Sequence, residues 1–287
     1  MGWNKKGWYE RQEISKVTLD WLKSNVNPTE REMELLQIIQ QRKLVSRDHL
    51  EILSPSYRDV GKSRTRVINR ALRRLYDGMC IDKVHEKQEM GKGNKPFIIA
   101  LDRGGSILLR IPHKRRIPIR KEVVRGQERI FRSVPSFFRH VNGINQLEVD
   151  TILFCIEHGF EIIRWEHEIP REFHYDDKVV VIPDVTASIR FGDKTLNTYI
   201  EYDTGSENIR HKDRFPLILE KIVKYRKYKI SRLWEDESPY FPVVLFVTED
   251  ERRIPYFNEK CEENKIRGVG VYHENYIEVL SHLARMS

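Results

Sequence analysis

The sequence predicts an α+β protein of two domains, and three observations support this. The 287 residues are enough to form two modest hydrophobic cores. Helical periodicity and one strand-like hairpin fill the first part of the chain, whereas alternating helix and strand patterns follow Pro135. The charge is uneven, because 51 Lys and Arg against 43 Asp and Glu give a net charge of +8, and the excess lies before residue 135. We predict an N-terminal extension (1–27), a first domain (28–110), a basic linker (111–133) and a second domain (134–287).

Composition narrows the class of partner. A basic first half attracts a polyanion, for which nucleic acid is the first candidate and an anionic membrane surface is the rival. No stretch approaches the roughly 20 apolar residues of a membrane span, and no export signal opens the chain. Cys80, Cys155 and Cys261 are odd in number and far apart, which predicts neither a disulfide framework nor a cysteine zinc site. The sequence therefore predicts a cytoplasmic protein with no membrane segment.

The first domain begins after an extension that contains several tryptophans but no motif with an assignable role. The pattern sharpens at Thr29, which with Glu32 forms a capping box. The apolar spacing that follows predicts the first helix, with one buried face. That face is made of Leu35, Leu36, Ile38 and Ile39.

Two further helices are predicted. Ser46 is suited to cap a short helix that runs through Leu53. After Pro55 and Gly61, a third helix is predicted over residues 62–76. A turn of about 100° per residue places one apolar stripe on this helix. The stripe consists of Ile68, Ala71, Leu72 and Leu75.

The opposite side of the third helix carries long hydrogen-bond donors, and no acidic residue interrupts them before Asp77. Such a helix can fill a DNA groove and reach phosphates and base edges. The donors are Lys62, Ser63, Arg66, Asn69, Arg70 and Arg73. We expect Arg66 and Arg70 to contact bases.

Strand-like runs at residues 79–86 and 96–101 follow the third helix, and the polar turn between them carries Lys92 and Lys95. Three helices followed by a basic hairpin resemble the winged helix-turn-helix of bacterial regulators and replication initiators, over about residues 28–110. The resemblance implies a double-stranded DNA partner, with Lys92 and Lys95 on phosphates. The alternative is a three-helix interaction domain whose basic face is merely solvated.

The segment 111–132 is strongly basic and has little helical periodicity. Its cations are Lys114, Arg115, Arg116, Arg120, Lys121, Arg125, Arg129 and Arg132. Two interpretations remain: an arm that follows a phosphate backbone, or a solvated tether.

The second domain is predicted as a mixed sheet flanked by helices. A helix capped by Ser136 runs to Gly159, with apolar positions that include Ile144, Ile152 and Ile156. The remaining predicted elements are strands at 161–168, 179–191 and 197–203, a helix at 215–228, strands at 242–247 and 269–272, and a closing helix from Glu274. The order is αβββαβ, with further elements after it.

Acidic residues lie on these predicted strands. Asp184 falls within the second strand, and Glu201 and Asp203 end the third, where residues two apart point to the same face. Carboxylates of this kind suit Mg²⁺ or Mn²⁺, which can activate water against a phosphodiester. Glu148 is a weaker candidate ligand, because it falls on the inward stripe of the preceding helix.

These residues resemble the signature of the PD-(D/E)XK nuclease superfamily. The chain is still more similar to the bacterial replication-relaxation family of plasmids and mobile elements, over about residues 30–275. The matching pieces are Phe138-Arg139-His140-Val141-Asn142, Trp165-Glu166-His167-Glu168, Pro183-Asp184, Ile200-Glu201-Tyr202-Asp203-Thr204-Gly205, the helical face of Lys221, Tyr225 and Tyr228, and 241–248. The resemblance implies a winged helix followed by a restriction-endonuclease-like mixed sheet.

One departure from the signature affects activity. Asp203 stands where the nuclease signature has Lys, so a catalytic cation is missing there, and Lys221 or Lys224 on the following helix is a substitute. The acids are equally consistent with a degenerate site or with a structural network involving Arg214, Lys221 or Lys224. His140 and His167 are interpreted as capping or core histidines.

We therefore predict a DNA-binding protein acting in replication, relaxation, mobilisation or gene control of a mobile element. Its second domain supplies dimerisation or further DNA contact, and the sequence assigns it no certain cofactor, with Mg²⁺ expected only if the site is catalytic. The alternative is a Mg²⁺-dependent endonuclease or nickase that uses Asp184, Glu201, Asp203 and Lys221.

Overall fold

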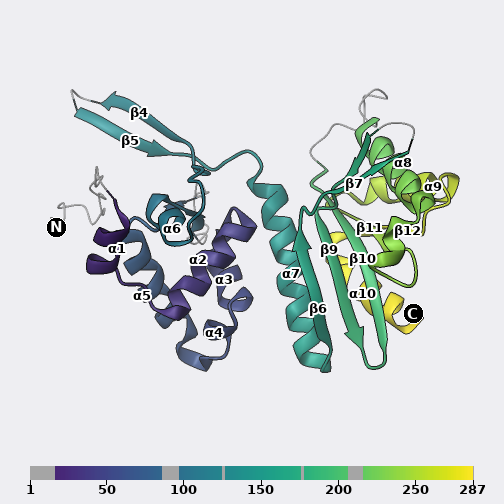
Figure 1. Cartoon of the computed structure of the whole chain (residues 1–287), viewed down its shortest axis with the longest axis horizontal. Coiled ribbons are helices and arrows are strands. Elements are labelled where there is room, and N and C mark those ends of the chain that lie inside the picture. The colour runs from purple at the N-terminus through teal and green to yellow at the C-terminus, as the bar shows by residue number, and fades with distance from the viewer. Residues whose placement is uncertain (1–16, 86–96, 125–126, 176–177, 206–215, 287) are drawn as a thin grey trace. The chain divides into compact units, whose positions relative to one another are not determined.

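The computed structural model describes residues 17–85, 97–124, 127–175, 178–205 and 216–286 (Figure 1). The chain forms two compact units, residues 1–142 and 143–287, and their border falls inside the long helix α7 (Phe138–His158). The protein is of the mixed α+β class, and the largest sheet among the described residues has five strands. Within the described ranges, no helix has the length and apolar character needed to cross a membrane.

The three helices predicted for the first domain are present as α2 (Glu30–Arg42), α3 (Arg47–Leu53) and α5 (Arg64–Asp77). The first unit also contains α1 (Leu19–Asn25), α4 (Pro55–Arg58) and α6 (Arg103–Leu108), and a 3₁₀ turn, η1 (Gly61–Ser63), precedes α5. The capping box is confirmed, because Thr29 accepts from the backbone of Glu32 and the Glu32 carboxylate accepts from Thr29 in return. Ser46 caps α3 as predicted, by accepting from the backbone N–H of His49.

A small antiparallel sheet completes this unit, with β1 (Val45–Ser46), β2 (Ile81–Val84) and β3 (Ile98–Leu101) in the order β1-β3-β2. β2 and β3 confirm the two predicted strand runs. The turn that carries Lys92 and Lys95 lies outside the described residues. The sheet packs into a core that includes Leu44, Val84 and Ile98.

The segment predicted as a linker instead contains regular structure. β4 (Ile119–Val124) and β5 (Gln127–Arg132) pair antiparallel as a separate two-stranded sheet (Figure 1). These two strands were not predicted, because charged residues occur on both faces and the sequence does not alternate between polar and apolar positions.

The second unit is built on a five-stranded sheet in the order β12-β11-β10-β9-β6. Its strands are β6 (Glu161–His167), β9 (Val185–Phe191), β10 (Lys194–Asp203), β11 (Val243–Thr248) and β12 (Gly268–Tyr272). β10, β11 and β12 are parallel, whereas β9 is antiparallel to β10 and to β6. β7 (Arg171–His174) and β8 (Lys178–Val181) form a separate pair.

Helices cover both faces of this sheet. α7 and α10 (Tyr276–Met286) pack on one face, around Val185, Ile200 and Tyr202. α8 (Pro216–Ser231) and α9 (Ile254–Glu263) pack on the other, around Tyr199 and Phe246. The remaining elements are the 3₁₀ turns η2 (Leu233–Asp236), η3 (Glu251–Arg253) and η4 (His273–Asn275).

Three expectations about this unit need correction. The strand predicted over 179–191 is two strands, β8 and β9, with Pro183 and Asp184 between them, because proline has no N–H to donate to a sheet. Ile156 was expected on the apolar face of its helix, but it is 57% exposed. β7 and α9 were not predicted at all, because their short sequences carry many charges.

Candidate functional site

The first candidate surface is the polar face of α5. The apolar stripe predicted for this helix is buried, and the opposite side chains of Ser63, Arg66, Asn69, Arg70 and Arg73 are exposed. Lys62 belongs to the turn before α5, and its side chain lies outside the described part of the structure. The predicted separation of a core face from a donor face is therefore confirmed for the described positions.

The arginines of α5 divide into two groups. Arg64 donates to Glu51 at 3.2 Å, and Arg74 makes a two-pronged contact with Glu32, where its Nε lies 2.8 Å from Oε1. Arg73 lies 3.9 Å from Asp77, which is a weaker contact. In the described ranges, no hydrogen bond or ion pair involves the guanidinium groups of Arg66 and Arg70. Acidic neighbours thus hold the ends of α5, while the middle of its polar face presents its donors to solvent.

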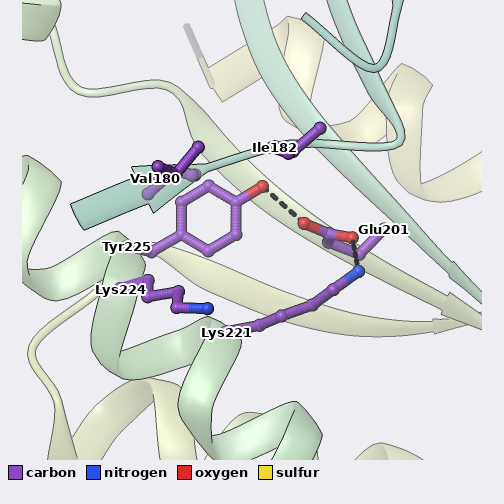
Figure 2. A pocket seen from close by; sticks show the side chains of 7 residues that line it. Val180, Ile182, Glu201, Lys221, Lys224 and Tyr225 are labelled. Carbon is purple, nitrogen blue, oxygen red and sulfur yellow. Dashed lines mark hydrogen bonds and ion pairs between the residues drawn. The ribbon is translucent and has the colours of Figure 1, made fainter. Parts of the chain in front are cut away.

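The second candidate site lies in the second unit, around Glu201 on β10 (Figure 2). One carboxylate oxygen accepts a hydrogen bond from the Tyr225 hydroxyl at 2.7 Å, and the other pairs with the Lys221 ammonium. Both partners come from α8, where a spacing of four residues places them on one side of the helix. Glu201 and Tyr225 are buried, whereas Lys221 is half-exposed.

Asp184 completes this cluster. Its position in the break between β8 and β9 lets its Oδ2 accept from the backbone N–H of Tyr202 at 2.7 Å. Its Oδ1 lies 4.0 Å from the Lys221 ammonium. Asp184, Glu201 and Lys221, which are three of the candidate site residues, therefore lie together. We call these three residues, with Tyr225, the β10–α8 cluster.

Burial sets the electrostatics of the β10–α8 cluster. Desolvation, and then the nearby Asp184, raise the pKa of Glu201 to about 7, although Lys221 and Tyr225 oppose the shift. Burial alone lowers the pKa of Lys221, but Glu201 and Asp184 outweigh it and raise that pKa above its usual value. Glu201 thus exchanges a proton near neutral pH while Lys221 stays charged.

Asp203 is not part of this cluster. Its carboxylate accepts from the Thr248 hydroxyl at 3.0 Å and pairs with Arg253 at 2.7 Å. Arg253 precedes α9 and is only 3% exposed. Sequence reasoning missed this partner, because nothing in the local sequence around Arg252 and Arg253 distinguishes the buried arginine from the exposed one.

Glu148 is also engaged elsewhere, because its carboxylate lies 3.2 Å from Nε2 of His167. This contact joins α7 to β6. Across the described residues, no group of three or more His, Cys, Asp or Glu side chains is arranged to hold a metal ion. The predicted four-carboxylate set is therefore not assembled.

A smaller set does fit Mg²⁺. This ion usually keeps several waters and takes only one or two protein carboxylates together with substrate oxygens. Asp184 and Glu201 supply two such carboxylates beside a lysine. Asp203 and Glu148 are not available for the role in this arrangement.

A pocket of about 200 Å³ opens beside Glu201. Figure 2 shows Glu201, Lys221, Lys224 and Tyr225 along it, opposite residues of β8 and the chain that follows. Lys224 pairs with Glu220 at 2.6 Å, one turn back on α8. Lys224 therefore lines the same pocket as Lys221 without binding its carboxylates. Arg214 lies outside the described residues.

Comparison with known proteins gives one family match. The family described as Replication-relaxation matches residues 36–244. No curated protein matches the sequence.

Two solved structures show a distant similarity. The restriction endonuclease FokI matches with a TM-score of 0.27 and 11% identity, over 86% of this chain and 42% of that one. FokI bound to DNA matches with a TM-score of 0.25 and 12% identity, over 86% and 43%. The chain spans less than half of either, and a similarity at this level does not establish a shared fold.

Proposed function

The chain belongs to the replication-relaxation family, and from this premise we propose that it is a double-stranded DNA-binding protein of a plasmid or other mobile element. Its role is in replication, relaxation or mobilisation, or in control of the element's genes. The first unit acts as a winged helix that reads DNA with α5, and the second is a nuclease-like domain that adds contacts without cleaving.

The observation that carries this proposal is the division of the arginines on α5. Helices that fill a groove present Arg and Lys to phosphates and base edges. Arg66 and Arg70 are exposed and lack ion-pair partners among the described residues, while Arg64 and Arg74 are held by acids. The order α2-β1-α3-α5-β2-β3 supports the same interpretation, because the second half of a helix-turn-helix presents its exposed face to the major groove.

The test begins with selection of preferred duplexes from a random-sequence pool by the full chain. Fluorescence anisotropy then gives the affinity of a selected duplex for wild type and for Arg66→Ala/Arg70→Ala. Each lost base contact is expected to weaken binding by about 1–3 kcal/mol. Arg226→Ala/Arg285→Ala is the matched control, because it removes the same charge from exposed positions on α8 and α10. Equal affinity of wild type and the Arg66/Arg70 variant would refute the proposal.

A second candidate function is metal-dependent DNA cleavage, and the contacts of Lys221 favour it. In this function Asp184 and Glu201 would hold Mg²⁺, which would lower the pKa of water and neutralise charge on a phosphodiester. Lys221 supplies the cation that Asp203 cannot, and Tyr225 fixes the orientation of the Glu201 carboxylate. This function needs Lys221 to exchange its contact with Glu201 for one with the substrate.

Supercoiled plasmid with Mg²⁺ distinguishes the two functions. Nicking by wild type that is lost in Asp184→Ala and Lys221→Ala, and retained in Lys224→Ala, would establish cleavage. Lys224→Ala is the control, because this lysine lines the same pocket and has a different partner. Circular dichroism of each variant shows whether a loss reflects unfolding. Intact plasmid with every folded variant supports the binding protein.

A further inference from the structure

We propose that β4 and β5 form a second DNA-binding element, a ribbon that enters a groove beside the part of the duplex contacted by α5. This inference rests on the proposed DNA binding and adds a surface to it. Residues 110–132 contain nine Lys or Arg and two acidic residues. The charge of the segment therefore suits a polyanion.

The ribbon is uncovered where the structure describes it. The exposed side chains include Arg120, Lys121, Val123 and Phe131, and Val123 is 75% exposed. No third strand joins β4 and β5 in the described part of the chain. An isolated two-stranded hairpin is at best marginally stable in water, so an uncovered ribbon gains stability from a partner.

The root of the ribbon is fixed to the first unit. Ile117, just before β4, is 1% exposed and belongs to the core that includes Val84 and Ile98. Arg132, at the end of β5, donates to the buried Asp82 on β2 at 2.8 Å. The ribbon therefore rises from the β2–β3 hairpin, which follows α5 in the same unit. A fixed root means that the ribbon reaches a defined place on bound DNA.

The register places cations on both faces of the ribbon. Lys121 pairs with Ile130 across the strands, and Arg120 pairs with Phe131, so the two basic residues point to opposite sides. A ribbon that binds a flat anionic surface needs cations on only one of its faces. Cations on both faces suit a groove, because phosphates line both of its walls and a two-stranded ribbon fits within it. Arg120 contacts Glu122 at 2.9 Å, but exposed pairs of this kind are weak and yield to phosphate.

Proximity labelling tests the inference independently of affinity. The three native cysteines are buried, so an iron-chelate reagent added to Val123→Cys reacts at the exposed ribbon position. Hydroxyl-radical footprinting first defines the part of a selected duplex that wild type protects and Arg66→Ala/Arg70→Ala does not. We expect the labelled protein to cleave the DNA strands next to that part. Labelled protein that binds the duplex without cutting it near that footprint overturns the inference.

Salt dependence provides the second measurement. Binding weakens as salt concentration rises, and each lost phosphate contact reduces the magnitude of the slope of log affinity against log salt concentration by about 0.9. Arg120→Ala/Lys121→Ala is expected to reduce the magnitude of the slope by nearly twice this value, and Arg226→Ala/Arg285→Ala to reduce it less. An unchanged slope for the ribbon variant, with binding still lost in the Arg66/Arg70 variant, overturns the ribbon and leaves the proposed function standing. Failure of wild type to bind any duplex overturns both.

The rival occupant is a second copy of the chain. Sedimentation of wild type and Arg120→Ala/Lys121→Ala without DNA addresses it directly. A change of oligomeric state together with an unchanged salt slope would assign the ribbon to self-association and reject the DNA contact. The same oligomeric state in both proteins, with the lower slope, supports the groove contact.

Discussion

The polar face of α5 and the β10–α8 cluster use charge in opposite ways. On α5, Arg66 and Arg70 are exposed, and within the described structure they have no ion-pair partner. In the cluster, Lys221 contacts both Glu201 and Asp184, and Tyr225 donates to Glu201. Charges left to solvent are available to a partner at little cost, whereas paired and buried charges first serve the fold. DNA binding is thus supported more directly than cleavage, which would have to rearrange internal contacts.

The largest expected effect on stability comes from breaking the ion pair between Arg253 and Asp203 in the second unit. Arg253→Met removes a cation that is 3% exposed and leaves the carboxylate at β10 with fewer partners. Loss of one partner from a buried pair costs about 3 kcal/mol of unfolding free energy. Urea denaturation measures it.

The adjacent arginine is the control for that prediction. Arg252 pairs with Asp250 but its side chain is 80% exposed. Arg252→Met is therefore expected to change the unfolding free energy by less than about 1 kcal/mol. Similar losses in both variants would contradict the idea that burial of Arg253 makes the Asp203 pair important.

The next effect concerns pH and tests whether Glu201 is as buried as its contacts indicate. Burial raises the pKa of this carboxyl from 4.5 to about 7, so the folded protein holds a proton that the unfolded chain releases. The contribution of Glu201 to the unfolding free energy is greatest below pH 4.5, falls as the pH rises toward 7 and stays constant above pH 7. The difference in unfolding free energy between wild type and Glu201→Gln should change by on the order of 2 kcal/mol over that range.

Urea titrations of wild type and Glu201→Gln at a series of pH values measure this difference. Titrating groups that do not interact with Glu201 are common to both proteins and cancel. A constant difference from pH 4.5 to pH 7 would mean that Glu201 has the same pKa in the folded and the unfolded chain, so that the cluster has an ordinary carboxylate.

Much of the α5 surface could be predicted from sequence because its causes are local. A period of 3.6 residues separates the buried stripe from the donors, and the capping box of Thr29 and Glu32 fixes where α2 begins. The selection among the arginines was not predictable, because Glu51 and Glu32 come from other helices. Periodicity gives the face of a helix and says nothing of which donors have tertiary partners.

The β10–α8 cluster was predicted in part. Alternation along the strand placed Glu201 and Asp203 on one face, which agrees with their contacts to α8 and to the start of α9. The different partners of these two carboxylates depend on Arg253, which stands just before α9, a helix that was not predicted. The family resemblance, rather than spacing, pointed to Lys221 and Tyr225, because no local pattern links a helix to the strand before it.

A third prediction sharpens the contrast within α5 itself. Arg74 holds Glu32, whose carboxylate is nearly buried and also completes the capping box of α2. Arg74→Ala removes charge-assisted hydrogen bonds but leaves Glu32 its contacts with Thr29, so the loss of unfolding free energy should be about 1–2 kcal/mol. Urea denaturation measures this loss, and anisotropy should show nearly unchanged affinity for a selected duplex. Weaker DNA binding with full stability would place Arg74 in the interface instead.

The smallest stability effect is expected four residues earlier on the same helix. Arg70 is exposed and its guanidinium contacts no acid in the described structure, so Arg70→Ala should change the unfolding free energy by no more than about 0.5 kcal/mol. The same substitution should weaken binding of a selected duplex by about 1–3 kcal/mol. Measured side by side, Arg70→Ala and Arg74→Ala should give opposite profiles, one losing affinity and the other stability. If Arg70→Ala lost stability as Arg74→Ala does, the polar face of α5 would be part of the packing of the first unit and unavailable to DNA.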